Sequence, residues 1–107
     1  MSSERIAGVG DVPEGEVRVM TCAGGRSLAV SNIDGTLYAI DNICTHDGGP
    51  LGEGRLRNGR VICPRHGAAF DARTGKVLTL PAVKSVHAYQ VTVDGDDVLV
   101  DCDGAEA

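Results

Sequence analysis

Three dipeptides, Asp34-Gly35, Asn58-Gly59 and Asp94-Gly95, each separate two short apolar runs of this 107-residue chain. Asp-Gly and Asn-Gly readily adopt the positive φ angles of a type I′ turn, so each dipeptide predicts a two-residue β-hairpin. No window of helical length shows a clean apolar repeat of 3.6 residues. The sequence therefore predicts an all-β fold of antiparallel hairpins with little helix.

Two segments interrupt this alternation of strand and turn. Residues 44–54 and 63–68 are rich in glycine and proline, and each begins where a short apolar run ends, which indicates two irregular loops. The length of the chain indicates a single domain over residues 1–107. Its expected parts are a β base, over about 1–40 and 84–103, and an inserted lobe over about 41–83 that carries both loops.

The composition excludes several classes of function. A formal net charge of −5 argues against binding nucleic acid through its phosphates, and it fits docking to a basic patch on a protein partner. Residues 1–16 contain no apolar core of a signal peptide, and no apolar run approaches the length of a membrane span. We therefore expect a cytoplasmic protein with no membrane contact and no nucleic-acid partner.

The chain has four cysteines and three histidines. In a reducing cytosol a disulfide framework is not expected, so metal ligation or simple burial is the better interpretation of the cysteines. Cys22 and Cys102 fall in predicted strands, and His87 lies near the start of one, without a partner at ligand spacing. We interpret these three as ordinary structural residues, the two cysteines as small buried apolar side chains.

The remaining four residues, Cys44, His46, Cys63 and His66, form two Cys–His pairs, one on each loop. Two thiolates and two imidazoles can hold a tetrahedral Zn²⁺ ion, or a [2Fe–2S] cluster with both thiolates on one iron and both imidazoles on the other. Structural zinc sites usually pair like ligands, as C-x2–4-C and H-x3–5-H. Because each loop here supplies one Cys and one His, the spacing favours two metals with different ligand sets.

The pattern C-x-H-x16-C-x2-H, written here as CTH and CPRH, resembles the fingerprint of Rieske [2Fe–2S] proteins. The stretches DNICTHDGGPLGEG and ICPRHGAAFDARTGKV resemble the ferredoxins of aromatic-ring-hydroxylating dioxygenase systems, and the resemblance covers nearly the whole chain. It implies a Rieske-like small antiparallel β-sandwich base with an inserted cluster-binding lobe formed by two loops. It also implies that Cys44, His46, Cys63 and His66 ligate one Rieske-type [2Fe–2S] cluster.

The same resemblance implies an electron carrier and not an enzyme. A monomeric ferredoxin of this kind would pass one electron from an NAD(P)H-dependent flavoprotein reductase to a terminal ring-hydroxylating oxygenase, as part of aromatic hydrocarbon catabolism. Small Rieske-like chains also resemble the small subunit of assimilatory nitrite reductase, which is the alternative function. A structural zinc domain is the third.

Other branches of the Rieske family differ at four positions. Rieske proteins of quinol-oxidising complexes carry one extra Cys in each loop, where this chain has Gly49 and Arg65, so that disulfide is impossible here. They also place a Ser and a Tyr hydroxyl on the cluster sulfurs, at the positions of Ala68 and Phe70. Because hydrogen bonds to sulfur raise the potential, we expect a value near the low end of the Rieske range of roughly −150 to +300 mV.

Overall fold

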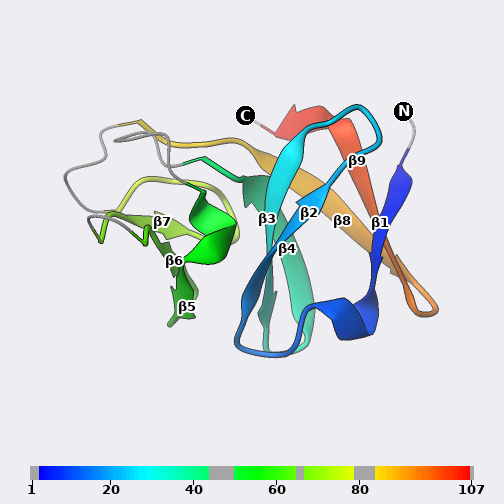
Figure 1. Cartoon of the computed structure of the whole chain (residues 1–107), viewed down its shortest axis with the longest axis horizontal. Helices are drawn as coiled ribbons and strands as arrows, with labels where there is room; N and C mark the ends of the chain where they lie inside the picture. Colours follow the sequence, from blue (N-terminus) through cyan, green and yellow to red (C-terminus); the bar gives the residue numbers. More distant parts are fainter. Residues whose placement is uncertain (1–2, 44–49, 65–66, 79–83, 107) are drawn as a thin grey trace.

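The computed structural model describes residues 3–43, 50–64, 67–78 and 84–106 (Figure 1). The described residues form nine strands and two short 3-10 helices. The elements are β1 (Glu4–Gly8), η1 (Val9–Asp11), β2 (Val17–Thr21), β3 (Ser27–Ile33), β4 (Thr36–Asp41), η2 (Leu51–Glu53), β5 (Arg55–Arg57), β6 (Arg60–Ile62), β7 (Ala69–Asp71), β8 (Ala88–Asp94) and β9 (Asp97–Glu106). None of the helices in these ranges has the length and apolar character needed to cross a membrane.

Six strands form one antiparallel sheet, here called the large sheet, in the order β1-β9-β8-β4-β3-β2. Two of its interior strands, β3 and β4, carry runs of consecutive buried residues. Because successive residues of a strand point to opposite sides, both faces of these strands are covered. Leu28 and Ala39 pack into one apolar cluster together with β8 and β9 residues. Ala29 and Ile40, on the other face, pack into a second cluster that also contains Val61 and Phe70, which lie outside this sheet.

The remaining strands form a three-stranded antiparallel sheet, here called the small sheet, in the order β5-β6-β7. It lies to one side of the large sheet (Figure 1). Val61 and Phe70 are directly opposite each other and fully buried, and they share the second cluster with Ile40 of the large sheet. The all-β antiparallel prediction is confirmed, whereas the proposed boundaries of base and lobe remain a prediction.

The hairpin turns confirm two of the three turn predictions residue for residue. Asp34-Gly35 joins β3 to β4 and Asn58-Gly59 joins β5 to β6, and all four residues have positive φ, as a type I′ turn requires. The third turn lies one residue later than predicted, because Asp94 pairs with Asp97. Gly95, with φ of 64°, therefore takes the first central position, where the type II′ turn prefers glycine.

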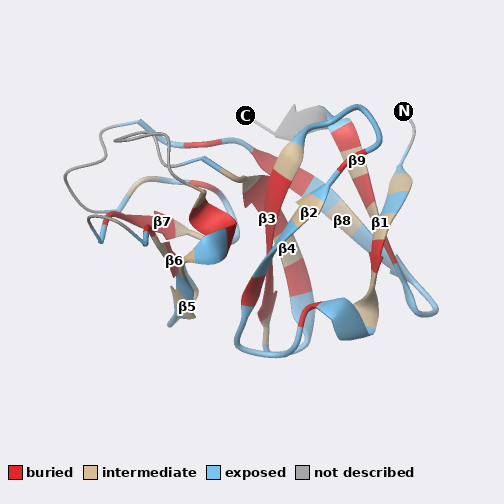
Figure 2. Cartoon of the chain, in the orientation of Figure 1, coloured by how far each residue is buried: buried red, intermediate tan, exposed pale blue. Residues whose placement is uncertain are grey.

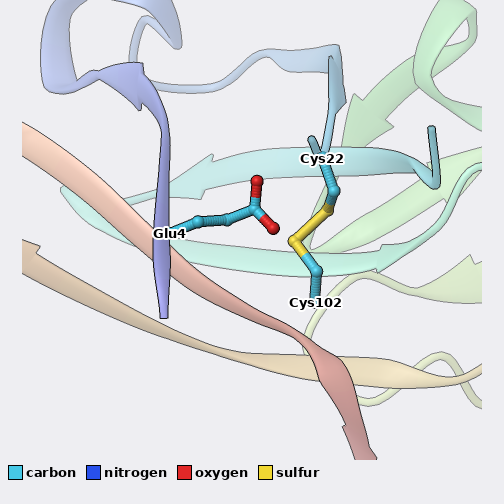
Figure 3. A group of neighbouring side chains, drawn as sticks. All are labelled: Glu4, Cys22 and Cys102. Atoms are coloured by element: carbon cyan, nitrogen blue, oxygen red, sulfur yellow. A yellow bond between two sulfur atoms is a disulfide. The ribbon is translucent and has the colours of Figure 1, made fainter. Parts of the chain in front are cut away.

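Cys22, which follows β2, forms a disulfide with Cys102 of β9. Both cysteines are buried as expected, but the expectation that they are unpaired is wrong. The large sheet curls so that the end of its edge strand β2 lies beside β9, with the two Cα atoms 6.4 Å apart despite a sequence separation of 80 residues. Figure 3 shows the Glu4 carboxylate beside this disulfide, where its Oε2 accepts a hydrogen bond of 2.6 Å from the Ala23 amide.

Candidate metal centre

Cys63 is the one predicted ligand that falls within the described residues. Cys44, His46 and His66 lie outside those ranges. Cys63 immediately follows β6, and its residue exposure is 2%. The strand therefore delivers the Cys63 side chain to the edge of the core at the end of the small sheet.

The backbone fixes Cys63 at the base of a short loop. The Cys63 amide donates to the Ala68 carbonyl at 2.8 Å, and the Gly67 amide donates to the Cys63 carbonyl at 3.2 Å. Gly67 has φ of 74°, a left-handed conformation that glycine adopts at little cost. The next pair, Ile62 and Ala69, continues the ladder between β6 and β7. The position of Cys63 is thus set by a hairpin rather than by a long flexible segment.

The surroundings of Cys63 suit a buried sulfur ligand. Ala68 and Phe70 are fully buried in the same apolar cluster, and neither side chain carries a hydrogen-bond donor. On its other side Cys63 lines a cavity of about 420 Å³ with Pro64 and Gly67, which are both exposed. Metal ligation requires the thiolate form of such a sulfur. A thiol between a packed core and an open cavity, on a chain that also supplies a second Cys and two His, fits the Rieske ligand set.

One side chain, that of Asn42, links described residues that precede and follow Cys44 and His46 in the sequence. Asn42 Nδ2 donates to Ser27 Oγ at 2.9 Å, and Asn42 Oδ1 accepts from the Gly52 amide at 2.5 Å. The adjoining Leu51 is fully buried. These contacts tie the residues before and after the loop to the start of β3. Sequence reasoning did not single out Asn42, although its place between a strand and the Cys-x-His motif is a usable signal.

A hydrogen-bond network joins β8 to the end of β4 close to Asn42. The Tyr89 hydroxyl donates to Asp41 Oδ1 at 2.5 Å and accepts from Arg26 Nη1 at 2.8 Å. Burial, and then the Asp41 carboxylate, raise the pKa of Tyr89 above its ordinary value. His87 is held by the same carboxylate: its amide donates to Asp41 Oδ2 at 3.0 Å, and its Nδ1 lies 3.3 Å from that oxygen. The structural role predicted for His87 agrees with these contacts.

Away from the candidate centre, one group in the described ranges brings a carboxylate and two cysteines close enough for a metal. The ligand atoms of Glu4, Cys22 and Cys102 lie within 4.8 Å of one another (Figure 3). Both sulfurs are consumed by the disulfide, so this group offers no thiolate.

Comparison with known proteins places the chain in a family. The family model described as "Rieske [2Fe-2S] domain" matches residues 3–90. The ferredoxin subunit of the 3-phenylpropionate/cinnamic acid dioxygenase of Shigella flexneri is 39% identical over 100 residues, which cover 92% of each chain. The ferredoxin component of the naphthalene 1,2-dioxygenase system of Pseudomonas aeruginosa is 35% identical over 91 residues, covering 85% of this chain and 86% of the relative.

Solved structures give the same result. The ferredoxin of carbazole 1,9a-dioxygenase from Nocardioides aromaticivorans superimposes with a TM-score of 0.87 and 32% identity, over 94% of this chain and 97% of that one. The fold also matches a complex of reduced oxygenase and oxidised ferredoxin of carbazole 1,9a-dioxygenase, with a TM-score of 0.84 and 30% identity over 92% of this chain and 91% of that one.

A protein described as a nitrite reductase small subunit has a TM-score of 0.78 at 19% identity, over 94% of this chain and 98% of that one, a likeness of fold alone. The resemblance to dioxygenase ferredoxins predicted from the CTH and CPRH motifs is confirmed, and with it a Rieske-type [2Fe–2S] cluster as the cofactor. The chain belongs to the Rieske [2Fe–2S] domain family.

Proposed function

We propose that Cys44, His46, Cys63 and His66 hold one [2Fe–2S] cluster and that the protein is an electron carrier with no substrate chemistry of its own. The observation that carries this proposal is the position of Cys63: a buried sulfur at a strand end, beside a cavity, in the motif that resembles the Rieske fingerprint. The bound cluster supplies a reversible one-electron change. The chain supplies the proposed ligands and an apolar wall, which Ala68 and Phe70 form in the group of core residues that contains Cys63.

The apolar wall has a direct consequence for the potential. Hydrogen bonds to the sulfurs favour the reduced, more negative state. Ala68 and Phe70 pack as donor-free side chains in the cluster of core residues that contains Cys63. We therefore expect a potential in the lower part of the Rieske range of roughly −150 to +300 mV, suited to accepting an electron from a flavin.

The proposed path runs from NAD(P)H through a flavoprotein reductase to this protein, and on to a terminal ring-hydroxylating oxygenase of aromatic hydrocarbon catabolism. The names of the two relatives and of the structures at 30% and 32% identity support the oxygenase end of this path. The flavoprotein end follows from the expected potential. The nitrite reductase alternative has weaker support, since its structural likeness falls to 19% identity.

Anaerobic reduction followed by electron paramagnetic resonance, metal and sulfide analysis and a redox titration test the cofactor and its potential together. We expect two irons and two sulfides per chain, a signal in the reduced state only, and a midpoint in the lower part of the range given above. One zinc per chain and no reduced-state signal would contradict the proposal. Electron delivery is then measured as reoxidation of the reduced protein by the terminal oxygenase of the Pseudomonas aeruginosa naphthalene system, with a buffer-only control.

Substitution of the proposed ligands gives a direct test of the site. Cys63→Ser should remove most of the bound iron, and His46→Cys should lower the potential or prevent assembly, because a thiolate adds negative charge where an imidazole is neutral. Cys22→Ser is the matched control, since Cys22 belongs to the disulfide of the large sheet, and it should keep full iron content. An unchanged spectrum for His46→Cys, or loss of iron in Cys22→Ser, would show that the ligands are misassigned.

We also propose that the protein is a monomer located in the cytoplasm. Structural disulfides are uncommon in a reducing cytosol. Free thiols at Cys22 and Cys102 in cells would therefore support a cytoplasmic location, and an intact disulfide would argue against it. Rapid alkylation of intact cells followed by mass spectrometry counts the thiols, and light scattering of the purified protein gives its mass.

A tight complex with a much larger siroheme protein would favour the nitrite reductase alternative instead.

A further inference from the structure

The two parts of the chain carry opposite charges. The segment between β4 and β8, residues 42–87, contains seven of the ten basic residues and three of the fifteen acidic ones. The rest of the chain contains three basic and twelve acidic residues. The formal net charge of −5 is therefore the sum of +4 on the segment that contains the candidate centre and −9 on the remainder. A count over the whole chain hides this separation.

Three arginines of that segment share one face of the small sheet. Arg57 and Arg60 are directly opposite each other across the hairpin, and directly opposite residues of an antiparallel pair project from the same face. Arg55 lies two residues before Arg57 in β5 and thus on the same side. Leu56 and Val61, which alternate with them, pack toward the core. All three arginines are exposed. Figure 2 shows exposed residues, coloured pale blue, along β5.

No described carboxylate neutralises these three guanidinium groups: within the ranges given above, Arg55, Arg57 and Arg60 form no ion pair. Asp71 is directly opposite Arg60 on β7, yet its Oδ1 accepts a hydrogen bond from the Arg73 amide instead.

The arginines of the large sheet are different. Arg5 pairs with Asp97 and Arg18 pairs with Glu16. Like charges directly opposite each other in a sheet are unfavourable, so the Arg57–Arg60 pair should destabilise the isolated protein slightly. A partner with negative charge would relieve this repulsion.

This arginine face begins at the candidate centre. Arg55 lines the cavity that also contains Cys63, Pro64 and Gly67. A protein bound to the arginine face would therefore lie against the loop of a proposed cluster ligand, where an electron has a short route between the partners. The acidic large sheet would at the same time be repelled by a negatively charged partner, and the two effects orient the molecule in the same sense.

We propose that Arg55, Arg57 and Arg60 form a docking surface for a carboxylate-rich face of the terminal oxygenase, and that the charge separation brings the candidate centre to that partner first. The proposal rests on the function proposed above and reverses the expectation drawn from the net charge, which was a basic patch on the partner. An extended polyanion such as nucleic acid is disfavoured, because the −9 on the remainder of the chain would repel it.

Stopped-flow oxidation of the reduced holoprotein by ferricyanide, a small multivalent anion, measures the local charge at the electron exit. If the +4 segment governs the encounter, the rate constant falls as salt rises from about 0.02 to about 0.5 M, because screening weakens an attraction. If the net charge of −5 governs it, the rate constant rises with salt, which overturns the proposal. Hexaamminecobalt(III), a cation, should show the opposite salt dependence.

Charge reversal locates the effect on the surface. Arg60→Glu should lower the low-salt rate with ferricyanide several-fold, and Arg55→Glu should lower it at least as much because Arg55 is nearer to Cys63. Arg5→Glu, which makes the same change of charge on the large sheet, is the matched control and should change the rate less than about twofold. Equal effects of Arg5→Glu and Arg60→Glu would overturn the assignment of the surface.

The same variants are then tested with the naphthalene oxygenase as electron acceptor, at low salt. The Arg55→Glu and Arg60→Glu variants should slow reduction of the oxygenase several-fold, while Arg5→Glu should not. If these variants slow only their own reduction by the flavoprotein reductase, and not the reduction of the oxygenase, the proposal is overturned. Absence of a reducible cluster would appear differently, as no electron transfer to any oxidant. A failure of the proposed function and a failure of the docking surface are therefore distinguishable.

Discussion

The large and small sheets reach stability in different ways. The large sheet has six strands of five to ten residues, and a disulfide joins the end of one edge strand to β9. The small sheet has three strands of three residues each, at the short end of the usual range of strand lengths. It is held through Val61 and Phe70, which pack against the large sheet. The candidate centre is therefore built on the part that depends most on its neighbours.

This difference separates two kinds of mutational effect. Damage inside the large sheet should lower global stability and leave the geometry around Cys63 intact as long as the protein is folded. Damage at the contact between the sheets should release the small sheet and the cluster together, since metal binding and local folding are coupled. The predictions below test this separation, from the largest expected effect to the smallest.

Phe70→Ala should give the largest effect, because Phe70 is the largest fully buried side chain among the residues that the structure describes, and it packs between the sheets. We expect the free energy of unfolding to fall by about 3–5 kcal/mol and the iron content to fall with it. Leu28→Ala is the control: Leu28 is equally buried, but in the cluster inside the large sheet. It should cost about 2–5 kcal/mol and retain its iron below the unfolding transition. Equal loss of iron in both variants would show that the two sheets are not separable.

Cys22→Ser tests the large sheet alone. Removal of a native disulfide that closes a long loop typically lowers the free energy of unfolding by about 2–5 kcal/mol, and here 80 residues separate the two cysteines. We expect a lower denaturant midpoint with unchanged iron content and potential. A reductant should produce the same shift in the wild type and none in the double variant Cys22→Ser/Cys102→Ser. A wild-type denaturant midpoint that is the same with and without reductant would show that the disulfide does not contribute to stability.

The disulfide marks a boundary of what the sequence could predict. The turns at Asp34-Gly35 and Asn58-Gly59 follow from the conformational preferences of adjacent residues, so local chemistry is enough to find them. The pairing of Cys22 with Cys102 follows from the curling of the large sheet, a property of six strands together. Cysteine spacing does not contain that information, and the compartment argument pointed the other way.

The candidate site shows the same division. The Cys–His spacing singled out Cys63 as a predicted ligand, and the structure places this residue, buried, at a strand end. The supporting contacts were not predictable. Asn42 interacts with Ser27 and Gly52, and Tyr89 interacts with Asp41 from 48 residues away. Such contacts depend on strand order. The uneven distribution of charge could be counted in the sequence. The pairing of β4 with β8 was needed to show that residues 42–87 leave the large sheet and return to it as one segment.

Asn42→Ala should have a moderate effect confined to the first ligand loop. It removes the acceptor of the Gly52 amide and a donor to Ser27, and should lower the free energy of local opening around these residues by about 1–2 kcal/mol, without a comparable change in the global free energy of unfolding. We expect faster loss of iron to a chelator with only a small change in the unfolding midpoint. Asn42→Asp keeps an acceptor for Gly52 and should restore most of the retention. Chelation rates that match the wild type in Asn42→Ala would mean that the loop is held by other contacts.

The smallest effect concerns Tyr89 and appears only at high pH. Burial and the Asp41 carboxylate raise the pKa of Tyr89, while Arg26 opposes them, so the folded protein holds the phenolic proton more tightly than the unfolded chain. Above the unfolded value of about 10 the unfolded chain releases this proton first, and stability falls as pH rises toward the folded pKa. Below that pH both states keep the proton, and the group contributes no pH dependence.

Denaturant midpoints measured between about pH 8 and 11 test this prediction. Tyr89→Phe should be less stable than the wild type near pH 8, because the hydrogen bond to Asp41 is lost, but its stability should decline less steeply above about pH 10. Asp41→Asn should reduce the slope only in part, since burial is the larger cause of the raised pKa. Because Tyr89 packs in the cluster inside the large sheet, neither variant should change iron content in this pH range. Loss of iron in step with loss of stability would mean that the network beside Asn42 couples the large sheet to the candidate centre.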